Sequence, residues 1–226
     1  RSKEPMQVVS GGPGRERVHY EAPPSDAVAR EMEALVRWWN SSRGEVDGLI
    51  RAALAHFRFV VIHPFQDGNG RIGRALADRA LAEDEKTGLR LYSMSTQICA
   101  ERNRYYAELE RASTGDGDVT QWIVWFLQCL ERAIVSSEER IETAEMKAKF
   151  WTNVSEFDLN QRQRKVLNKL LDAGRRGFEG GLTNKKYRAI TGCSPESAKR
   201  DIAELVELAL LVRNEGGGRS TSYRLA

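Results

Sequence analysis

The sequence predicts a mostly α-helical protein of two domains, with a β-hairpin near each end of the chain. Apolar residues recur at helical spacing in successive segments from Ser25 to Ile134. Glycine-rich turns at residues 11–14 and 215–218 each join two short segments with strand-like patterns. Residues 159–226 hold 14 Lys and Arg against 7 Asp and Glu, whereas the whole 226-residue chain has a formal net charge of +3. We therefore expect a main domain followed by a small basic one.

The composition narrows the class of protein. Hydrophobic residues make up 41% and charged residues 30%, which is ordinary for a folded domain. The longest strongly apolar stretch, Trp122–Leu127, is far too short to cross a bilayer, and no secretory signal opens the chain. We expect a cytoplasmic protein with no membrane contact. Because the first residue is Arg1 rather than Met, we also expect an upstream portion.

The chain has three cysteines, Cys99, Cys129 and Cys193. They are odd in number and widely spaced, and no CxxC pair is present. This predicts free, mostly buried thiols and no metal site built from sulfur.

The first domain is predicted to begin with a hairpin and a capped helix. Met6–Ser10 and Arg15–Tyr20 alternate partially and are joined by the turn Gly11–Gly14, which suits a mobile flap. Ser25 can cap the first helix. His19, near the end of the flap, is expected to be a hydrogen-bonded core residue.

Four more helices follow in the first domain. Pro64 disfavours the α region at His63, so the helix that starts at Asp47 should end there. His56 lies within this helix among apolar residues and is predicted to be a hydrogen-bonded core histidine. The next helices are expected to start near Gly70, at a cap Ser95 and at a cap Thr120.

The last part of the chain has the order helix, helix, helix, hairpin. Thr183 can cap the second of these helices, and Ser194 with Pro195 gives a cap and an N1 proline for the third. Residues 210–214 and 220–225 form the predicted hairpin. This order is typical of a winged helix-turn-helix. We therefore predict a first domain over residues 1–150, a linker over 151–158 and a winged helix-turn-helix domain over 159–226, with the charged residues 136–149 as a solvated helix.

Residues 63–74, HPFQDGNGRIGR, form the most informative segment. The GxGxxG spacing of a dinucleotide-binding turn is present, but the residues before it have helical periodicity, and that motif needs a strand. A Walker A loop fails, because Arg74 and Ala75 stand where Lys and Ser or Thr belong. A plain corner between two helices explains the glycines. It leaves four polar residues unexplained: His63, Asn69, Arg71 and Arg74.

A fourth interpretation uses all the polar residues as an anion site. Gly68 and Gly70 let backbone N–H groups approach a ligand at the positive end of a helix dipole. Arg71 and Arg74 are three residues apart and share a helix face, where their guanidinium groups can hold phosphate oxygens. Asn69 can donate to a further phosphate oxygen.

Two residues of the segment suit metal binding and proton transfer. Asp67 is an oxygen ligand of the kind that Mg²⁺ takes together with substrate phosphates. The reference pKa of a histidine, about 6.5, suits His63 to act as a general base. The segment therefore combines a base, a metal ligand and a phosphate cradle.

This segment resembles the Fic family motif, His-x-Phe-x-Asp/Glu-Gly-Asn-Gly-Arg-x-x-Arg, and matches it at every defined position. The hairpin at 6–20, the helix that ends at His63 and the segment Arg104-Tyr105-Tyr106 are also similar to the family's core, so the resemblance covers roughly residues 1–150. It implies transfer of AMP from ATP to a Ser, Thr or Tyr hydroxyl of a target protein, with Mg²⁺ required.

The resemblance also implies a role for each residue. His63 would deprotonate the target hydroxyl, and Asp67 would hold Mg²⁺ between the α- and β-phosphates. Asn69 and Arg71 would bind phosphates, and Arg74 would contact the terminal phosphate. Tyr106 is a candidate for the adenine pocket. The hairpin would present the target by pairing with it as an extra strand.

Phe65 is expected to point into the core and to anchor the loop, with no part in the chemistry.

Many proteins of this family carry an inhibitory helix with the pattern Ser/Thr-x-x-x-Glu-Gly/Asn. The pattern does not occur here, because Ser41 and Glu45 have the right spacing but Val46 follows. If the pattern lies upstream of Arg1, we expect this fragment to be deregulated.

Alternatives remain for both domains. The same cradle would suit transfer of UMP or phosphocholine, and a nucleotide-sensing DNA-binding regulator is a further possibility. In the basic tail, Lys199 and Arg200 could enter a major groove while Arg213 or Arg219 contacts phosphates. Winged helices also contact proteins or dimerise, so DNA, a protein and a second copy of the chain are all open as partners of the tail.

Overall fold

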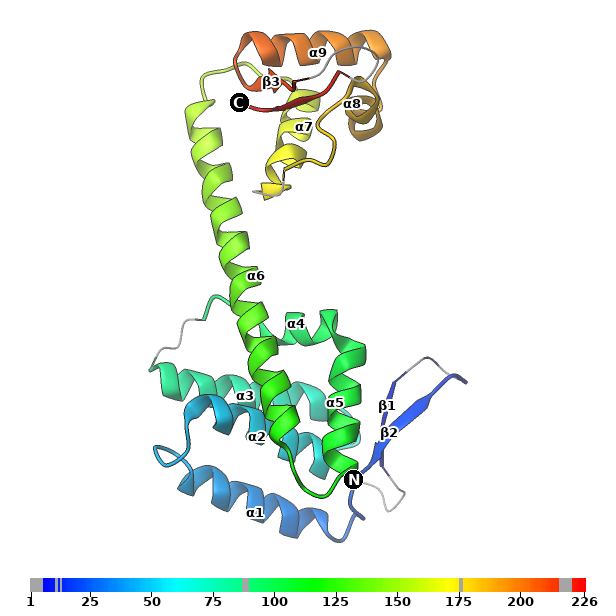
Figure 1. Ribbon diagram of the computed structural model, residues 1–226, viewed down its shortest axis with the longest axis vertical. Coiled ribbons are helices and arrows are strands. Elements are labelled where there is room, and N and C mark those ends of the chain that lie inside the picture. Colours follow the sequence, from blue (N-terminus) through cyan, green and yellow to red (C-terminus); the bar gives the residue numbers. More distant parts are fainter. Residues whose placement is uncertain (1–5, 11, 13, 87–89, 175–176, 216–220) are drawn as a thin grey trace. The chain divides into compact units, whose positions relative to one another are not determined.

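The computed structural model describes residues 6–10, 12, 14–86, 90–174, 177–215 and 221–226. The chain is mostly helical, as predicted, and it divides into two compact units, Arg1–Ser137 and Glu138–Ala226. Figure 1 shows the helices and strands of both units.

The described residues of the first unit form a two-stranded hairpin and five helices, together with the start of a sixth. In chain order these are β1 (Gln7–Ser10), β2 (Arg17–Glu21), α1 (Val28–Ser41), α2 (Gly48–Ile62), α3 (Asn69–Glu85), α4 (Met94–Ala100), α5 (Arg102–Thr114) and the beginning of α6 (Thr120–Asn153). Strands β1 and β2 pair antiparallel, which confirms the predicted hairpin. Gly11 and Pro13 of the predicted turn lie outside the described residues.

Helices α2 and α3 form the closest pair in the first unit. Small residues let their backbones approach: a Cβ at Gly73 would lie only 2.9 Å from Cγ2 of Val60, and a Cβ at Gly48 would overlap the side chain of Asp84. Trp122 of α6 covers the pair and donates from its indole N–H to the carbonyl of Ala53 at 2.9 Å. Because α2 and α3 pack closely, the residues between them form a short connection.

Several predicted helix ends are confirmed. Asp47 caps α2, because its carboxylate accepts the backbone N–H groups of Leu49 and Ile50, and α2 ends at Ile62 with His63 as its C-cap. Helix α6 begins at Thr120, so its start is confirmed, but Thr120 is the first residue within the helix rather than its cap.

Two predicted caps are wrong. Helix α1 starts after Ala27 without a side-chain cap, rather than at Ser25. The helix expected from Ser95 starts at Met94, where Ser93 is the cap, and it is two helices. The backbone of Glu101 leaves helical geometry between α4 and α5, and its carboxylate accepts two hydrogen bonds from Arg132 of α6 at 2.6 Å each.

The second unit has the predicted order of helices and strands. It comprises the end of α6, then α7 (Gln161–Leu171), α8 (Asn184–Thr191), α9 (Pro195–Glu207), β3 (Leu211–Arg213) and β4 (Tyr223–Leu225). Thr183 and Ser194 cap α8 and α9 as expected. Strands β3 and β4 pair antiparallel, and Leu182 bridges to Tyr223 beside them. The assignment as a winged helix-turn-helix stays a prediction.

A buried carboxylate ties the helices of the second unit together. Asp201 of α9 is 1% exposed and accepts two hydrogen bonds from Arg162 of α7 and one from the Tyr187 hydroxyl of α8. Burial alone raises the pKa of Asp201, but the hydrogen bonds and charge of Arg162 hold it below its usual value. The ion is therefore paired within the unit.

The division between the units falls earlier than the predicted linker at 151–158. The structure places it between Ser137 and Glu138, inside α6, which runs on to Asn153. Val154 lies inside the predicted linker and Leu159 directly follows it. Both residues are buried in the core of the second unit. These residues pack as part of that unit because their side chains are apolar.

The cysteines follow the sequence-based expectation only in part. The thiols are free, but Cys99 is exposed, Cys129 is buried and Cys193 is half-buried, so the expectation of mostly buried thiols is correct only for Cys129. Cys99 faces solvent on α4.

Over the described ranges, we find no helix with the length and apolar character needed to cross a membrane.

The basic side chains proposed for DNA lie in part on described elements. Lys199 and Arg200 are exposed on α9, and Arg213 is exposed on β3. Arg219 lies outside the described residues. DNA binding by this unit stays a prediction.

Candidate active site

The connection between α2 and α3 is a tight bend with a left-handed residue at each end. His63 has φ 52° and ψ 55°, and Gly68 has φ 88° and ψ −2° as the N-cap of α3. A non-glycine residue in this region is uncommon, and at φ 88° a glycine is strongly favoured. Pro64 stops the helix and the bend returns the chain at once into α3, so the predicted loop and helix start coincide.

Asn69 holds the bend closed from inside. It is 2% exposed, its side-chain oxygen accepts the N–H of Phe65 at 3.0 Å, and its amide N–H donates to the carbonyl of Phe65 at 2.7 Å. Nothing in the sequence around Asn69 indicates this bracing role. The phosphate contact of Asn69 stays a prediction.

Phe65 does not anchor the loop through its ring, as expected from the sequence. Its side chain is 48% exposed, and its ring centroid lies 6.2 Å from that of Phe59. The backbone of Phe65 is already fixed by Asn69, so the ring is not needed in the core. Its exposed ring lies next to the polar residues of the bend.

His63 is half-buried at the C-terminal end of α2. Its Nδ1 lies 3.2 Å from the carbonyl oxygen of Val60. Since a carbonyl can only accept, Nδ1 carries the proton and Nε2 is the basic nitrogen of the neutral ring. The backbone thus selects the tautomer that a general base requires.

Asp67 and Arg71 form an exposed ion pair on the outer side of the bend. Arg71 Nη2 donates to Asp67 Oδ2 at 2.9 Å, and the two side chains are 72% and 90% exposed. The N–H of Gly68 donates to the other carboxylate oxygen at 2.6 Å. Such exposed pairs contribute little to stability, so their groups can exchange partners for a ligand.

Arg74 lies one turn further along α3, where its Nε donates to the Ser95 hydroxyl at 3.1 Å. A Cβ at Gly70 would come within 3.3 Å of Nη1 of Arg74, so the guanidinium lies along the first turn of the helix. The sequence predicts Ser95 as a helix cap. Its position on α4 instead makes it a partner of a predicted phosphate-binding residue.

Beneath Arg74, His56 is buried as predicted. It is fully buried, and its Nε2 shares a hydrogen bond of 3.2 Å with the Tyr105 hydroxyl. Burial, helped by the nearby charge of Arg74, lowers the pKa of His56 to about 3. Burial likewise raises the pKa of Tyr105. His56 is therefore neutral and serves the core rather than the chemistry.

Tyr106, the candidate for the adenine pocket, lies on α5 against the hairpin. Its ring stacks on that of His19, with centroids 4.9 Å apart and planes 8° from parallel. One face of Tyr106 is thus covered by His19, and the adenine contact stays a prediction. His19 is 7% exposed and hydrogen-bonded to Glu110, which confirms its interpretation as a buried, bonded residue.

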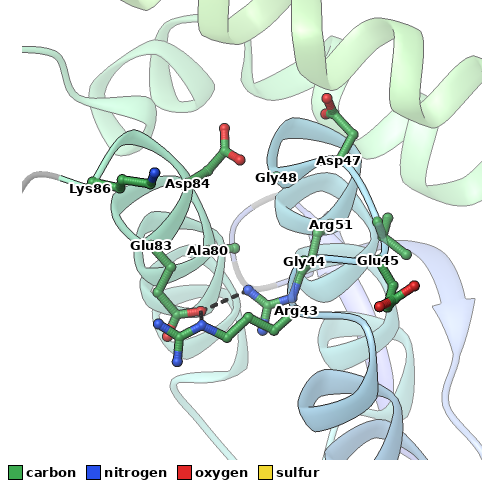
Figure 2. A pocket seen from close by; sticks show the side chains of 11 residues that line it. Arg43, Gly44, Glu45, Asp47, Gly48, Arg51, Ala80, Glu83, Asp84 and Lys86 are labelled. Atoms are coloured by element: carbon green, nitrogen blue, oxygen red, sulfur yellow. Dashed lines mark hydrogen bonds and ion pairs between the residues drawn. The ribbon is translucent and has the colours of Figure 1, made fainter.

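A second group of charged residues lies at the other end of the α2–α3 pair. Figure 2 shows Arg43 and Arg51 converging on Glu83 there. Arg51 is 3% exposed and donates to Glu83 at 2.8 Å, to the Ser42 hydroxyl at 3.1 Å and to the Trp39 carbonyl at 3.0 Å. Burial raises the pKa of Glu83, but hydrogen bonds from Arg51 and Arg79 lower it overall.

Comparison with known proteins finds a family that the first part of this chain resembles. Residues 2–81 match the model of the Fic/DOC family. The chain is therefore similar to the Fic/DOC family over these residues.

Two relatives of this chain have names that state an activity. Protein adenylyltransferase Fic of Drosophila yakuba is 33% identical over 129 residues, which cover 57% of this chain and 23% of that protein. Protein adenylyltransferase fic-1 of Caenorhabditis elegans is 36% identical over 90 residues, which cover 39% of this chain and 16% of that protein. The matched part of this chain thus spans less than a quarter of these relatives.

Among solved structures, the chain is similar to a Fic family protein from Desulfovibrio desulfuricans G20. The likeness has a TM-score of 0.47 at 21% identity and covers 94% of this chain and 59% of that one.

Proposed function

We propose that this chain is a protein adenylyltransferase, which transfers AMP from ATP to a Ser, Thr or Tyr hydroxyl of a target protein and releases pyrophosphate. The observation that carries the proposal is the bend at 63–68, which brings a fixed imidazole tautomer, exposed charged side chains and the start of α3 together. The names of the relatives support the reaction class.

The phosphates of ATP would bind at the start of α3. The first N–H groups of a helix lack partners within it and point toward an anion, and Gly68 and Gly70 keep side chains out of the way. Arg71, with an exposed side chain, would take phosphate oxygens in place of Asp67. Arg74, held by Ser95, would contact the far end of the triphosphate.

The residues present fit Mg²⁺ bound together with ATP. Asp67 offers a carboxylate that is 90% exposed, and Mg²⁺ is typically held by one or two carboxylates with substrate phosphates. Bound there, Mg²⁺ would supply charge neutralisation at the phosphates.

His63 would act as the general base. The target hydroxyl gives its proton to Nε2 while its oxygen forms a bond to the α-phosphorus, and the bond from that phosphorus to the leaving pyrophosphate breaks. The Nδ1 hydrogen bond to Val60 keeps the ring in the required tautomer throughout. Positioning and charge neutralisation then supply most of the rate.

The hairpin β1–β2 would present the target by pairing with an extended segment of it. ATP and a protein with a hydroxyl side chain are therefore the proposed partners. A cytoplasmic location and a homodimer stay predictions.

Incubation with ATP radiolabelled at either the α- or the γ-phosphate tests the proposal. We expect acid-stable label on protein from the α position only, with equimolar pyrophosphate released and with loss of signal in EDTA. Label from the γ position would indicate a kinase, and no label from either would indicate a nucleotide sensor. Parallel reactions with α-labelled UTP and with labelled CDP-choline separate AMP transfer from transfer of UMP or phosphocholine.

A further inference from the structure

Among its described side chains, the hairpin meets the helical core through His19, buried in the middle of its second strand, and through Tyr20, which packs against the core beside it. Along β2, Val18 is 46% exposed, whereas the next residue, His19, is 7% exposed. The His19 ring lies flat against Tyr106, with centroids 4.9 Å apart, and its Nδ1 is 2.8 Å from Oε2 of Glu110. Both partners belong to α5. We call His19, Tyr106 and Glu110 the flap clamp.

The hydrogen bond of the flap clamp has a defined donor and acceptor. An ionised Glu110 carboxylate can only accept, so Nδ1 of His19 donates to it. Stacking fixes the tilt of the imidazole, and the hydrogen bond fixes its rotation about the ring normal. Two contacts of different kinds therefore set the height and the angle at which β2 lies on α5.

The helix that carries Tyr106 and Glu110 also packs against α2. Tyr105, the neighbour of Tyr106, shares a hydrogen bond with His56 of α2 at 3.2 Å, and the two tyrosine rings lie 5.1 Å apart, edge to face. The charge of Arg74 on α3 acts on both His56 and Tyr105. Adjacent residues of α5 thus connect the hairpin to the two helices that hold residues 63–74.

A two-stranded hairpin on its own is at best marginally stable in water, so its position depends on such attachments. At its base, the N–H of Ala22 donates to the carbonyl of Met6 at 2.8 Å, which joins the two strands to each other, and Ala22 is buried. Burial of Ala22 holds the base of the hairpin but not the direction of its strands. His19, together with the neighbouring Tyr20 packed on the core, supplies the attachment further along β2 that a rigid direction requires.

We infer that His19 is a positioning residue, which sets where a target segment paired with the hairpin meets the reacting centre. The inference rests on the proposed adenylyl transfer. The contacts of His19 with α5 hold the strand edge still, and the target hydroxyl then arrives at a fixed distance from the phosphorus. With His19 removed, ATP still binds, but the acceptor is misplaced, and water competes with it for the nucleotide.

Two measurements on the full chain test this role. Hydrogen exchange of the backbone amides of residues 17–21 reports on the attachment without any need for catalysis. The ratio of label transferred to an acceptor against AMP released by hydrolysis reports on positioning; the acceptor is a copy of this chain that carries His63→Ala. ATP binding is measured separately by calorimetry.

The variants separate the two contacts. His19→Ala removes both, His19→Phe keeps the stack on Tyr106, and Glu110→Gln weakens only the hydrogen bond. Glu108→Gln is the matched control, because Glu108 lies on the same helix but pairs with Arg111 of that helix. For His19→Ala we expect faster exchange in β2 and a transfer-to-hydrolysis ratio lowered about 10- to 100-fold, with an unchanged Kd for ATP. His19→Phe and Glu110→Gln should fall between this variant and the wild type, and Glu108→Gln should match the wild type.

The outcomes are distinguishable. Exchange in His19→Ala equal to that of the wild type would show that the flap clamp does not hold the hairpin and would overturn the inference. Faster exchange with an unchanged transfer-to-hydrolysis ratio would overturn the positioning role while leaving the attachment in place. A wild-type chain that labels no protein would overturn the proposed function, whatever the exchange shows.

Discussion

The two ends of the α2–α3 pair carry the same kinds of charged side chain in opposite settings. At one end, Arg51 is 3% exposed, and Glu83, at 17%, accepts hydrogen bonds from it and from Arg79. At the other end, Arg71 and Asp67 are 72% and 90% exposed and bond mainly to each other. A buried, fully bonded pair is fixed by the fold, whereas an exposed pair can open for a ligand. We therefore expect substitutions at the first end to affect stability and those at the second to affect nucleotide chemistry.

The largest expected effect is on catalysis at the exposed end. His63→Asn should lower AMP transfer about 100- to 10,000-fold, since the basic Nε2 is lost. Asparagine tolerates the left-handed backbone at φ 52° and offers an N–H near the position of Nδ1, so the bend should persist. The measurement is the rate of protein labelling with saturating ATP.

An unchanged melting temperature is the control for that variant. Transfer within tenfold of the wild type would show that His63 is not the base.

The next largest effect is expected at the buried end. Glu83→Ala leaves the Arg51 guanidinium buried without its carboxylate, which should lower the free energy of unfolding by about 3 kcal/mol. Tryptophan fluorescence during urea unfolding measures this, because Trp38, Trp39, Trp122 and Trp125 all belong to the first unit.

The remaining Glu83→Ala protein should still bind ATP with the affinity of the wild type at a temperature where it is folded. A loss of ATP binding without a loss of stability would reverse the assignment of the two ends.

Between the two ends, His56 makes the first unit sensitive to acid. Its pKa is about 3 in the folded chain and about 6.5 when unfolded, so below pH 6.5 the unfolded state takes up a proton that the folded state does not. The contribution of neutral His56 to the free energy of unfolding is fully present above pH 6.5. Below that pH, the free energy of unfolding should fall by about 1.4 kcal/mol for each pH unit. Urea midpoints between pH 7 and pH 5 measure the slope.

His56→Asn is the matched variant for this test, because it cannot take up the proton. It should be less stable at pH 7 and show a shallower slope below pH 6.5. Equal slopes in both proteins would mean that other groups cause the loss.

The smallest effect on stability is expected at the exposed pair. Arg71→Ala and Asp67→Asn should each change the free energy of unfolding by about 0.5 kcal/mol or less. Both should still weaken binding of ATP with Mg²⁺, measured by calorimetry. A destabilisation as large as that of Glu83→Ala would contradict the contrast between the two ends.

Local signals in the sequence were sufficient for the bend and for most helix ends. Asp47 before an apolar helix and Pro64 after it fix both ends of α2, and the glycines mark the start of α3. Ser95 shows the limit of such signals. It has the chemistry of a cap, but Ser93 takes that role, and Ser95 bonds to Arg74 instead.

The contacts that could not be foreseen join residues far apart in the chain. His19 and Glu110 are 91 positions apart, and Arg51 and Glu83 are 32 apart. Neither spacing leaves a periodic trace, because such pairs form only when separate elements pack together. Phe65 illustrates the same limit, since its exposure follows from Asn69 already bracing the bend.

The most direct test of the contrast between the two ends is a titration of the isotope-labelled chain with ATP and Mg²⁺, followed by the chemical shifts of its backbone amides. We predict that the signals of Gly68, Gly70 and Arg71 move with increasing nucleotide, while those of Arg51 and Glu83 stay in place. Shifts confined to Arg51 and Glu83, or no shifts at the start of α3 at millimolar ATP, would contradict the assignment of the bend as the nucleotide site.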